Sequence, residues 1–324
     1  MEVRSDALSS RVTAISRLRK YRPRDVGSAG SECPFCPGRE YSTPPATLVV
    51  KLREGKVAIL KDTAGERVKG WSVRIFPNLY PAFSTEGSGL DYGYHEVVVE
   101  TPEHQTELHS MRCEQLGLAL HASFLRLREI YSDNRVVHGL IFRNYGAGGG
   151  RSLTHPHTQL VATSFVLPEV MAEVERAEKH YVRSGRCLYC SMIEEEMKSE
   201  RLIHAGGGFA VIASRAPRTP YEALVVPVTH TPSPLDLQLS DAVELARVLQ
   251  ALMRAYRSVL GDVGYNMWVH LPPKGTGANS YHWHVEVLPT TSVWGGLEKG
   301  GGVYIVDTSP EEAAAELRKY FAVT

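Results

Sequence analysis

The sequence predicts an α+β fold made of two similar halves, each an antiparallel sheet flanked by helices. Three observations lead to this prediction. A His-x-His motif occurs twice, as His155-Pro156-His157 and as His282-Trp283-His284. Each copy lies downstream of a Cys-x-x-Cys pair. Each also follows an isolated histidine at nearly the same distance, since His104 lies 51 residues before His155 and His230 lies 52 residues before His282. Repetition on this scale indicates a duplicated structural unit.

In the first half, residues 95–100 read as a strand, and His104 follows directly before a long amphipathic helix over 105–131. A second strand over 139–143 leads into the glycine-rich loop 146–150. The strand that carries His155 and His157 comes next. The order is therefore strand, histidine, helix, strand, glycine-rich loop and histidine strand.

The second half repeats this order. Its elements are the strand 221–228 with His230 behind it, the helix 240–260, the strand 265–271, the loop 272–280 and the strand that carries His282 and His284. A polar stretch over 181–186 separates the two halves. We therefore expect an N-terminal unit over 1–183 and a C-terminal unit over 184–324.

Composition excludes several classes of protein. Lys plus Arg equals Asp plus Glu, 36 against 36, so no net charge favours binding to nucleic acid. No apolar run reaches the roughly 18 residues of a membrane span. The N-terminus is rich in Arg and Ser but lacks the apolar stretch of a secretory signal. We expect a cytoplasmic protein that binds neither nucleic acid nor membranes.

The paired cysteines and repeated histidines predict two metal sites. The first set is Cys33, Cys36, His104 and His155, and the second is Cys187, Cys190, His230 and His282. Two thiolates and two imidazoles form a tetrahedral zinc set with no open position, so we expect two structural zinc ions. The alternative for Cys187 and Cys190 is a disulfide or redox pair. A redox Cys-x-x-Cys should open a helix after a strand in a βαβ unit, and the residues on either side of this pair do not show that pattern. His270 is either an extra ligand or an ordinary strand histidine.

The first His-x-His motif has the features of a catalytic site. Residues i and i+2 of a strand face the same side, so His155, His157 and Gln159 should project together. The preceding loop ends in Gly150, Arg151 and Ser152, whose N–H groups, guanidinium and hydroxyl suit a phosphate. It matches neither a Walker A nor a Rossmann motif. A histidine beside such a loop suits attack on phosphorus with a phosphoramidate intermediate. The alternative is a pair of core histidines bonded to backbone carbonyls.

These motifs resemble those of galactose-1-phosphate uridylyltransferases, the transferase branch of the histidine-triad superfamily, over nearly the whole chain. The family signature is His-Pro-His-x-Gln with an asparagine eleven residues before the first histidine, where this chain has Asn144. The resemblance implies that both halves are histidine-triad-like. It also implies that His155 binds zinc, that His157 is the nucleophile and that Gln159 hydrogen-bonds the transferred phosphate.

Further substrate contacts are implied by the same resemblance. Phe76, Asn78 and Tyr80 resemble the nucleotide-pocket segment of the family. Gly150, Arg151 and Ser152 occupy its phosphate-loop positions, where Arg151 replaces a smaller residue. The segment Arg19-Lys20-Tyr21-Arg22-Pro23 resembles one whose first arginine reaches the partner subunit's nucleotide, which implies a homodimer with shared sites. Glu298 resembles a hexose-contacting glutamate, although Leu297 departs from the aromatic that the family has before it.

Gln159 favours transfer over hydrolysis. The hydrolases of the superfamily carry a histidine there, and an amide can hydrogen-bond but cannot move protons. The resemblance therefore implies ping-pong exchange of UMP between a UDP-sugar, UDP-glucose, and a hexose 1-phosphate, galactose 1-phosphate. The second cysteine pair matches related ADP-glucose phosphorylases, so adenylyl transfer with ADP-glucose is the alternative, and neither the base nor the hexose is decided. A zinc-bearing nucleic-acid-binding protein is the alternative from another class.

Three further expectations concern acidic residues and histidines not yet discussed. Glu173, Glu175 and Glu178 have the spacing of a solvated helix face. His95 has no role that follows from its position alone. His284 stands at the nucleophile's position in the second half, but Glu286 replaces the glutamine there, and we expect that half to be structural.

Overall fold

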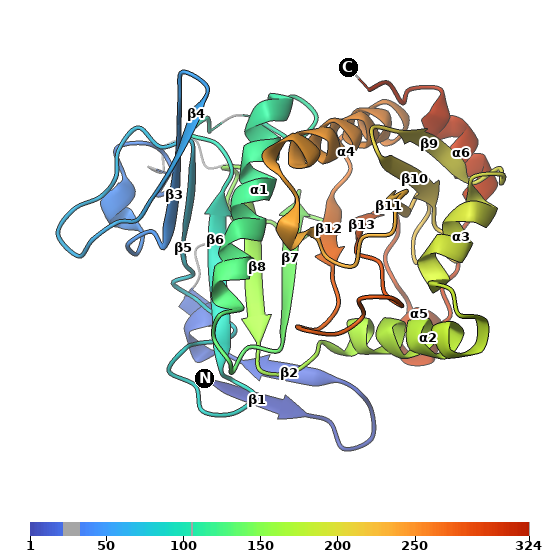
Figure 1. Cartoon of the computed structure of the whole chain (residues 1–324), viewed down its shortest axis with the longest axis horizontal. Coiled ribbons are helices and arrows are strands. Elements are labelled where there is room, and N and C mark those ends of the chain that lie inside the picture. Colours follow the sequence, from blue (N-terminus) through green and yellow to red (C-terminus); the bar gives the residue numbers. More distant parts are fainter. Residues whose placement is uncertain (22–32, 105, 324) are drawn as a thin grey trace.

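The computed structural model describes residues 1–21, 33–104 and 106–323, and most of them are built around one large sheet (Figure 1). Its strands are β3 (Leu48–Arg53), β4 (Lys56–Leu60), β5 (Val73–Pro77), β6 (Gly93–Val99), β7 (His138–Tyr145), β8 (His157–Thr163), β9 (Leu202–Gly206), β10 (Phe209–Ala213), β11 (Ala223–Pro227), β12 (Tyr265–His270) and β13 (His284–Pro289). The helices are α1 (Cys113–Ile130), α2 (Pro168–Ser184), α3 (Leu188–Glu196), α4 (Leu239–Leu260), α5 (Gly296–Gly301) and α6 (Pro310–Arg318). Near the N-terminus, β1 (Glu2–Ser5) and β2 (Val12–Ile15) form a separate hairpin, followed by the short helix η1 (Arg17–Tyr21).

The strand order of the sheet reproduces the internal repeat. It reads β4-β3-β5-β6-β8-β7-β12-β13-β11-β10-β9, so each half runs outward from the contact between β7 and β12 in the same relative order. At that contact Asn144 lies opposite Asn266 and Phe142 lies opposite Trp268, in antiparallel register. The predicted α+β class with two antiparallel, helix-flanked halves is confirmed. The halves share one continuous sheet, and their division at residue 183 stays a prediction.

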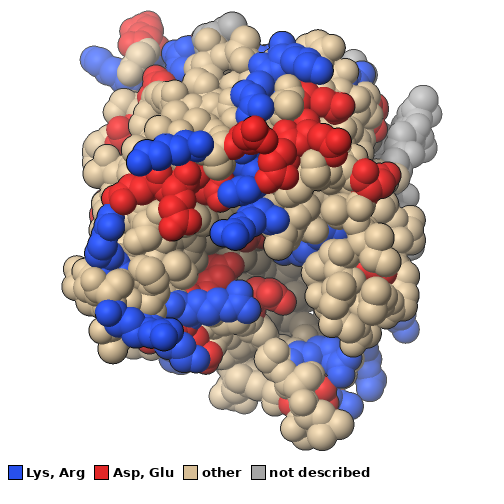
Figure 2. All heavy atoms as spheres, turned by 90° about the vertical axis from the view of Figure 1, so that its right-hand side faces the viewer, with Lys and Arg blue, Asp and Glu red and all other residues tan. Residues whose placement is uncertain are grey.

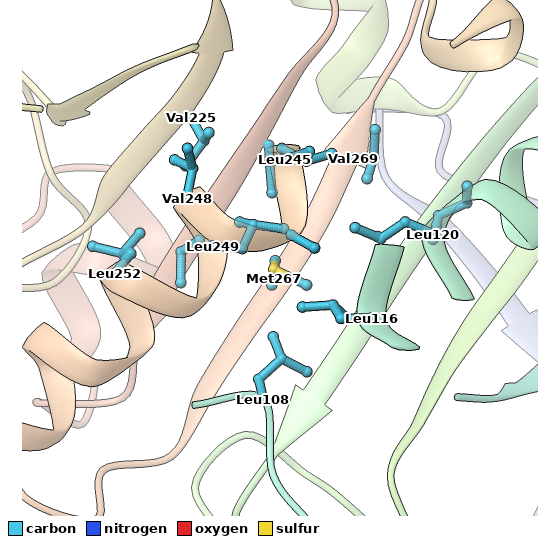
Figure 3. Packing of buried hydrophobic residues seen from close by; sticks show 14 of the residues in the cluster. Leu108, Leu116, Leu120, Val225, Leu245, Val248, Leu249, Leu252, Met267 and Val269 are labelled. Carbon is cyan, nitrogen blue, oxygen red and sulfur yellow. The ribbon is translucent and has the colours of Figure 1, made fainter. Parts of the chain in front are cut away.

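One face of this sheet carries the core. Helices α1 and α4 pack on it together, and Figure 3 shows Leu116 and Leu120 of α1 facing Met267 and Val269 of β12. From α4, Leu245 and Leu249 join the same cluster. Burying each such side chain stabilises the fold by about 1.5–3 kcal/mol. A capping box begins α4, and Gly261, the residue directly after Leu260, ends it.

The opposite face carries both His-x-His motifs. On β8, Leu160 and Ala162 belong to the helix-covered core, so His157 and Gln159 face the other side. In the first half the segment around Phe35 covers this face and packs its ring on Phe76, with ring centres 5.6 Å apart. In the second half α2 and α3 cover it, and Ile193 of α3 packs against β10 and β11.

Two predicted element boundaries are wrong. The helix predicted from residue 105 begins at Cys113, because Ser110 and Met111 bond back to the Glu107 carbonyl in a turn that buries Leu108. Gln105 lies outside the described residues. The histidine strands begin at His157 and at His284, so the first histidine of each motif precedes its strand. Pro156 has no N–H group to place in the ladder, which is consistent with a strand that starts after it.

Charges of both signs are mixed on the surface that Figure 2 shows, where basic side chains alternate with acidic ones. Arg201, for example, bonds Glu196 and Glu311 at 2.8 and 2.7 Å. A nucleic-acid-binding surface would need a basic stripe instead. None of the helices in the described ranges combines the length and the apolar character that a membrane crossing requires.

Candidate active site and metal centres

The first predicted metal cluster is assembled in the structure. The Sγ atoms of Cys33 and Cys36 lie 3.7 and 3.6 Å from Nδ1 of His155, and Cys36 Sγ lies 3.3 Å from Nδ1 of His104. All four ligand atoms lie within 4.8 Å of one another. Zinc bound at roughly 2.0–2.3 Å would put its tetrahedral ligands about 3.3–3.8 Å apart. The four side chains therefore fit a zinc ion with little movement.

Hydrogen bonds at Nε2, the ring nitrogen that does not face the thiols, orient the two imidazoles of this cluster. His155 Nε2 donates to the Thr101 carbonyl at 2.8 Å, which leaves the lone pair of Nδ1 facing the thiols. His104 Nε2 lies 3.3 Å from the Thr154 hydroxyl. Burial lowers the pKa of His155 to about 4, and burial together with neighbouring Cys33 raises the pKa of Cys36 to about 11. Zinc binding at this site would therefore release thiol protons.

The second cluster repeats this geometry. Cys190 Sγ lies 3.4 Å from Nδ1 of His230 and 3.9 Å from Nδ1 of His282, and Cys187 completes a set within 4.8 Å. His230 Nε2 lies 3.0 Å from the Ala278 carbonyl, as expected of an oriented ligand. The cysteine pair does open a helix, α3, but the preceding element is α2 rather than a strand. This context fits a metal site better than a thioredoxin-like redox motif.

His157 is held in a defined tautomer. Its Nδ1 donates to the His155 carbonyl at 2.8 Å, because a carbonyl can only accept. The lone pair of the neutral ring is therefore on Nε2. His157 is 7% exposed, and its ring packs edge-to-face with the Phe35 ring at 5.5 Å between ring centres. The candidate metal ligand His155 and the candidate nucleophile His157 are thus separated by one residue, Pro156, and joined by one hydrogen bond.

Gln159 lies on the same strand face as His157, as predicted, and its Oε1 atom lies 2.9 Å from Nε2 of His95. Asn78 and Tyr80 of the predicted nucleotide pocket lie close to this contact between His95 and Gln159. Asn78 accepts from the Tyr80 N–H at 2.8 Å, and its amide nitrogen lies 3.3 Å from the same His95 Nε2. Sequence reasoning missed His95, whose partner Gln159 lies 64 residues further along the chain.

The glycine-rich loop is fixed by a residue from the second half. Asn266 Nδ2 donates to Asn144 Oδ1 and to the Gly149 carbonyl, both at 2.8 Å. A side chain at Gly149 would place its Cβ 2.3 Å from the Tyr145 carbonyl oxygen, so only glycine fits there. No local pattern points to Asn266, because its partners lie more than a hundred residues away along the chain.

Arg151 is paired with a carboxylate of the same chain. Its guanidinium bonds Glu107 at 2.8 Å and stacks over the Tyr145 ring at 4.8 Å. The N–H groups of Gly150 and Arg151 close a turn onto the carbonyls of Ala147 and Gly146. The phosphate contacts that the resemblance implies for Gly150, Arg151 and Ser152 stay predictions.

The second half carries a polar cluster at the place that corresponds to the His157 site. His270 Nδ1 lies 2.9 Å from Glu173, and the Tyr281 hydroxyl donates to Glu173 at 2.6 Å. The prediction that Glu173 lies on a solvated face is therefore wrong, because its partners come from residues about a hundred positions away. Glu286 accepts from Arg218 at 2.5 Å. Glu173, His270, His284 and Glu286 lie within 4.8 Å of one another and could also hold an ion.

Arg19 and Glu298 lie in separate elements. Arg19 belongs to η1, and Arg22 and Pro23 of its segment lie outside the described residues. Glu298 belongs to α5, where its carboxylate accepts from the Gly295 N–H at 2.9 Å and caps its own helix. Their predicted contacts with a partner subunit stay predictions.

The chain is similar to known sugar-nucleotide enzymes over nearly its whole length. The model of the galactose-1-phosphate uridyl transferase N-terminal domain matches residues 74–167. An ADP-glucose phosphorylase from Arabidopsis thaliana is 28% identical over 98% of this chain and 92% of its own length. A galactose-1-phosphate uridylyltransferase from Thermotoga maritima is 25% identical over 98% of both chains. The crystal structure of an ADP-glucose phosphorylase from Arabidopsis thaliana with bound ADP-glucose is similar at a TM-score of 0.80 and 27% identity, covering 100% of this chain and 99% of that one.

The matched range contains His157, Gln159 and the loop before them. Both relatives align with 98% of the chain. The chain is therefore an enzyme of the galactose-1-phosphate uridylyltransferase family.

Proposed function

We propose that the enzyme transfers a nucleoside monophosphate from a nucleoside-diphosphate hexose to a second sugar phosphate through a covalent intermediate on His157. The hydrogen bond from His157 Nδ1 to the His155 carbonyl carries this proposal, because it leaves the lone pair on Nε2. A neutral, oriented imidazole is the form that attacks phosphorus. Gln159 on the same strand face supplies an amide beside it.

In the first step Nε2 attacks the α-phosphorus of the donor. A P–N bond forms, the bond to the bridging oxygen breaks, and hexose 1-phosphate leaves with that oxygen. The positive charge that develops on the ring is stabilised by the Nδ1–H bond to the His155 carbonyl. In the second step an oxygen of the acceptor phosphate attacks the phosphorus, the P–N bond breaks, and His157 returns to its neutral form.

The two Cys/His clusters would hold zinc in this proposal. Zinc bound by four protein ligands supplies a structural cross-link, because it has no open position for substrate or water. In the first half the cluster ties Cys33 and Cys36 to His155. It would thereby hold the carbonyl that orients His157.

We propose UDP-glucose and galactose 1-phosphate as substrates, with UDP-galactose and glucose 1-phosphate as products. The family match over residues 74–167 and the Thermotoga relative support this choice. ADP-glucose is the second candidate donor. The assembled second cluster favours it, since its cysteines resemble those of ADP-glucose phosphorylases, and the Arabidopsis relative supports it as well.

Turnover of the two donors side by side tests this proposal. We expect kcat/KM for UDP-glucose with galactose 1-phosphate to exceed that for ADP-glucose, with either galactose 1-phosphate or inorganic phosphate as acceptor, by at least about tenfold. That ratio corresponds to about 1.4 kcal/mol of transition-state discrimination. A preference for ADP-glucose would mean that the enzyme transfers an adenylyl group and not a uridylyl group. Failure of every donor and acceptor pair to react would refute nucleotidyl transfer itself.

A further inference from the structure

His95 joins the nucleotide-pocket segment to the catalytic glutamine. It lies on β6 and is 4% exposed. Its Nδ1 accepts from the backbone N–H of Ala82 at 2.8 Å, and its Nε2 lies 2.9 Å from Oε1 of Gln159. A backbone N–H can only donate, so Nδ1 carries the lone pair and Nε2 carries the hydrogen of the neutral ring. His95 therefore donates to Gln159.

This hydrogen bond decides which end of the Gln159 amide faces His157. A glutamine amide has two orientations that exchange its oxygen and its nitrogen. With Oε1 bound to His95, the NH2 group is the end of the Gln159 amide that points away from His95. The reverse orientation would place two hydrogen donors together, His95 Nε2–H and the Gln159 amide, and would turn the amide oxygen toward an anionic phosphate. Both contacts are repulsive.

The Asn78 amide does not compete for this role. Its nitrogen lies 3.3 Å from His95 Nε2, but its oxygen already accepts from the Tyr80 N–H, so this nitrogen is a donor. Two donors cannot bond each other, so the Asn78 NH2 hydrogens must point away from Nε2–H. The Asn78 N–H in turn bonds the His95 carbonyl at 2.8 Å. His95 is thus held by Asn78, which belongs to the segment that resembles the family's nucleotide pocket, and by Ala82 just behind that segment.

We propose that His95 is a positioning residue that sets the orientation of the Gln159 amide, so that Gln159 presents its N–H group to the phosphate being transferred. This role rests on the proposed function of His157 and Gln159. It also links nucleotide binding to catalysis, because Ala82, whose N–H determines the tautomer of His95, lies two residues after Tyr80 of the predicted nucleotide-pocket segment.

Two substitutions of His95 separate this role from a structural one. The amide of His95→Gln reaches the position of Nε2 and can still donate to Gln159. The shorter amide of His95→Asn reaches the position of Nδ1 and can still accept from Ala82, but it leaves Gln159 without its donor. We expect His95→Gln to keep kcat within about threefold and His95→Asn to lower kcat on the order of 10²-fold, with KM for the nucleotide sugar little changed. The opposite ranking would overturn the proposal, since it would make His95 an anchor of the 78–82 segment.

A double variant tests whether the effect passes through Gln159. In a Gln159→Ala background, His95→Asn should cause no further loss of kcat, whereas independent residues would give multiplying losses. His138→Asn is the matched control, because His138 is also a buried strand histidine with both ring nitrogens bonded, to Leu271 and Leu167. It should lower the unfolding midpoint without lowering kcat.

The tautomer of His95 gives a readout that does not depend on turnover. Protein with ¹⁵N-labelled histidine should show the Nε2–H form for His95, assigned by the signal that disappears in His95→Gln. A wild-type protein that forms no nucleotidyl-histidine would refute the proposed function. Normal labelling of the wild type together with an Nδ1–H form of His95 would instead refute the positioning role alone.

Discussion

Replacing Glu100 by glutamine should destabilise the protein strongly, because Glu100 is the counter-charge of a buried arginine. Arg143 of β7 donates to the Glu100 carboxylate, and so does the hydroxyl of Thr158, which lies between His157 and Gln159. Glu100 and Arg143 are each 2% exposed. Burial alone would lower the pKa of Arg143, but Glu100 raises it above its ordinary value, so the guanidinium is charged. Glutamine keeps the shape of Glu100 and removes its charge.

The magnitude follows from the burial of the pair. Breaking a buried ion pair by neutralising one partner costs about 3–5 kcal/mol. Glu107 lies 3.7 Å from Arg143 and offsets part of the loss, so we expect the lower end, about 3 kcal/mol. An unfolding entropy of about 2.1 cal/mol/K per residue gives about 0.7 kcal/mol/K for this chain of 324 residues. The unfolding midpoint should therefore fall by about 4 °C.

Differential scanning calorimetry at pH 7 and fixed protein concentration measures this shift. Asp236→Asn is the control, since its ion pair with Arg128 is 3.6 Å long and both side chains are exposed, by 88% and 53%. An exposed pair contributes at most about 1 kcal/mol, or about 1 °C here. Equal midpoints for the two variants would refute the claim that the Glu100–Arg143 pair stabilises the strands that carry the site.

Three further predictions address the metal sites, the pH dependence and the subunit interface. Cys36→Ser should remove about half of the bound zinc in elemental analysis, because it breaks one of the two Cys/His clusters; an unchanged zinc content would contradict the ligand assignment. Burial lowers the pKa of His138 from 6.5 to about 4, so the unfolded chain takes up a proton in this window that the folded chain does not, and stability falls as the pH falls from 6.5 to 4. Denaturant titrations of the wild type should show this loss, up to about 3 kcal/mol from this residue, and His138→Gln should lack that contribution; identical pH profiles would refute it. Mixed dimers of inactive His157→Ala and inactive Arg19→Ala chains should regain part of the activity if Arg19 acts on the partner subunit, and no recovery despite proven subunit exchange would mean that each chain completes its own site.

Local patterns in the sequence predicted the fold well. The apolar run within 95–100 and the helical spacing over 240–260 correspond to β6 and α4, whose observed bounds differ from the predicted ones by only one or two residues. The repeated motifs predicted both Cys/His clusters, because each ligand occupies the same place in its half. The start of α1 was mispredicted, since the turn before it buries Leu108 and so continues the apolar pattern of the helix.

Contacts between distant segments were not predictable from local patterns. Asn266 fixes Asn144 across 122 residues, His270 meets Glu173 across 97, and His95 meets Gln159 across 64. Each pair depends on how strands align across the sheet or on how α2 folds under the second half. A single sequence contains no periodicity for such pairings, so Glu173 read as a surface residue and His95 as a residue without a role.

The location of the nucleotide during turnover tests the central claim most directly. Wild-type enzyme incubated with UDP-glucose labelled in the α-phosphate, without acceptor, should carry acid-labile and base-stable label on the peptide that contains His157. Nuclear magnetic resonance should place the phosphorus on Nε2, because Nδ1 is bonded to the His155 carbonyl. Galactose 1-phosphate should then discharge the label as UDP-galactose. Label that persists in His157→Gln, or that sits on Nδ1, would contradict this mechanism.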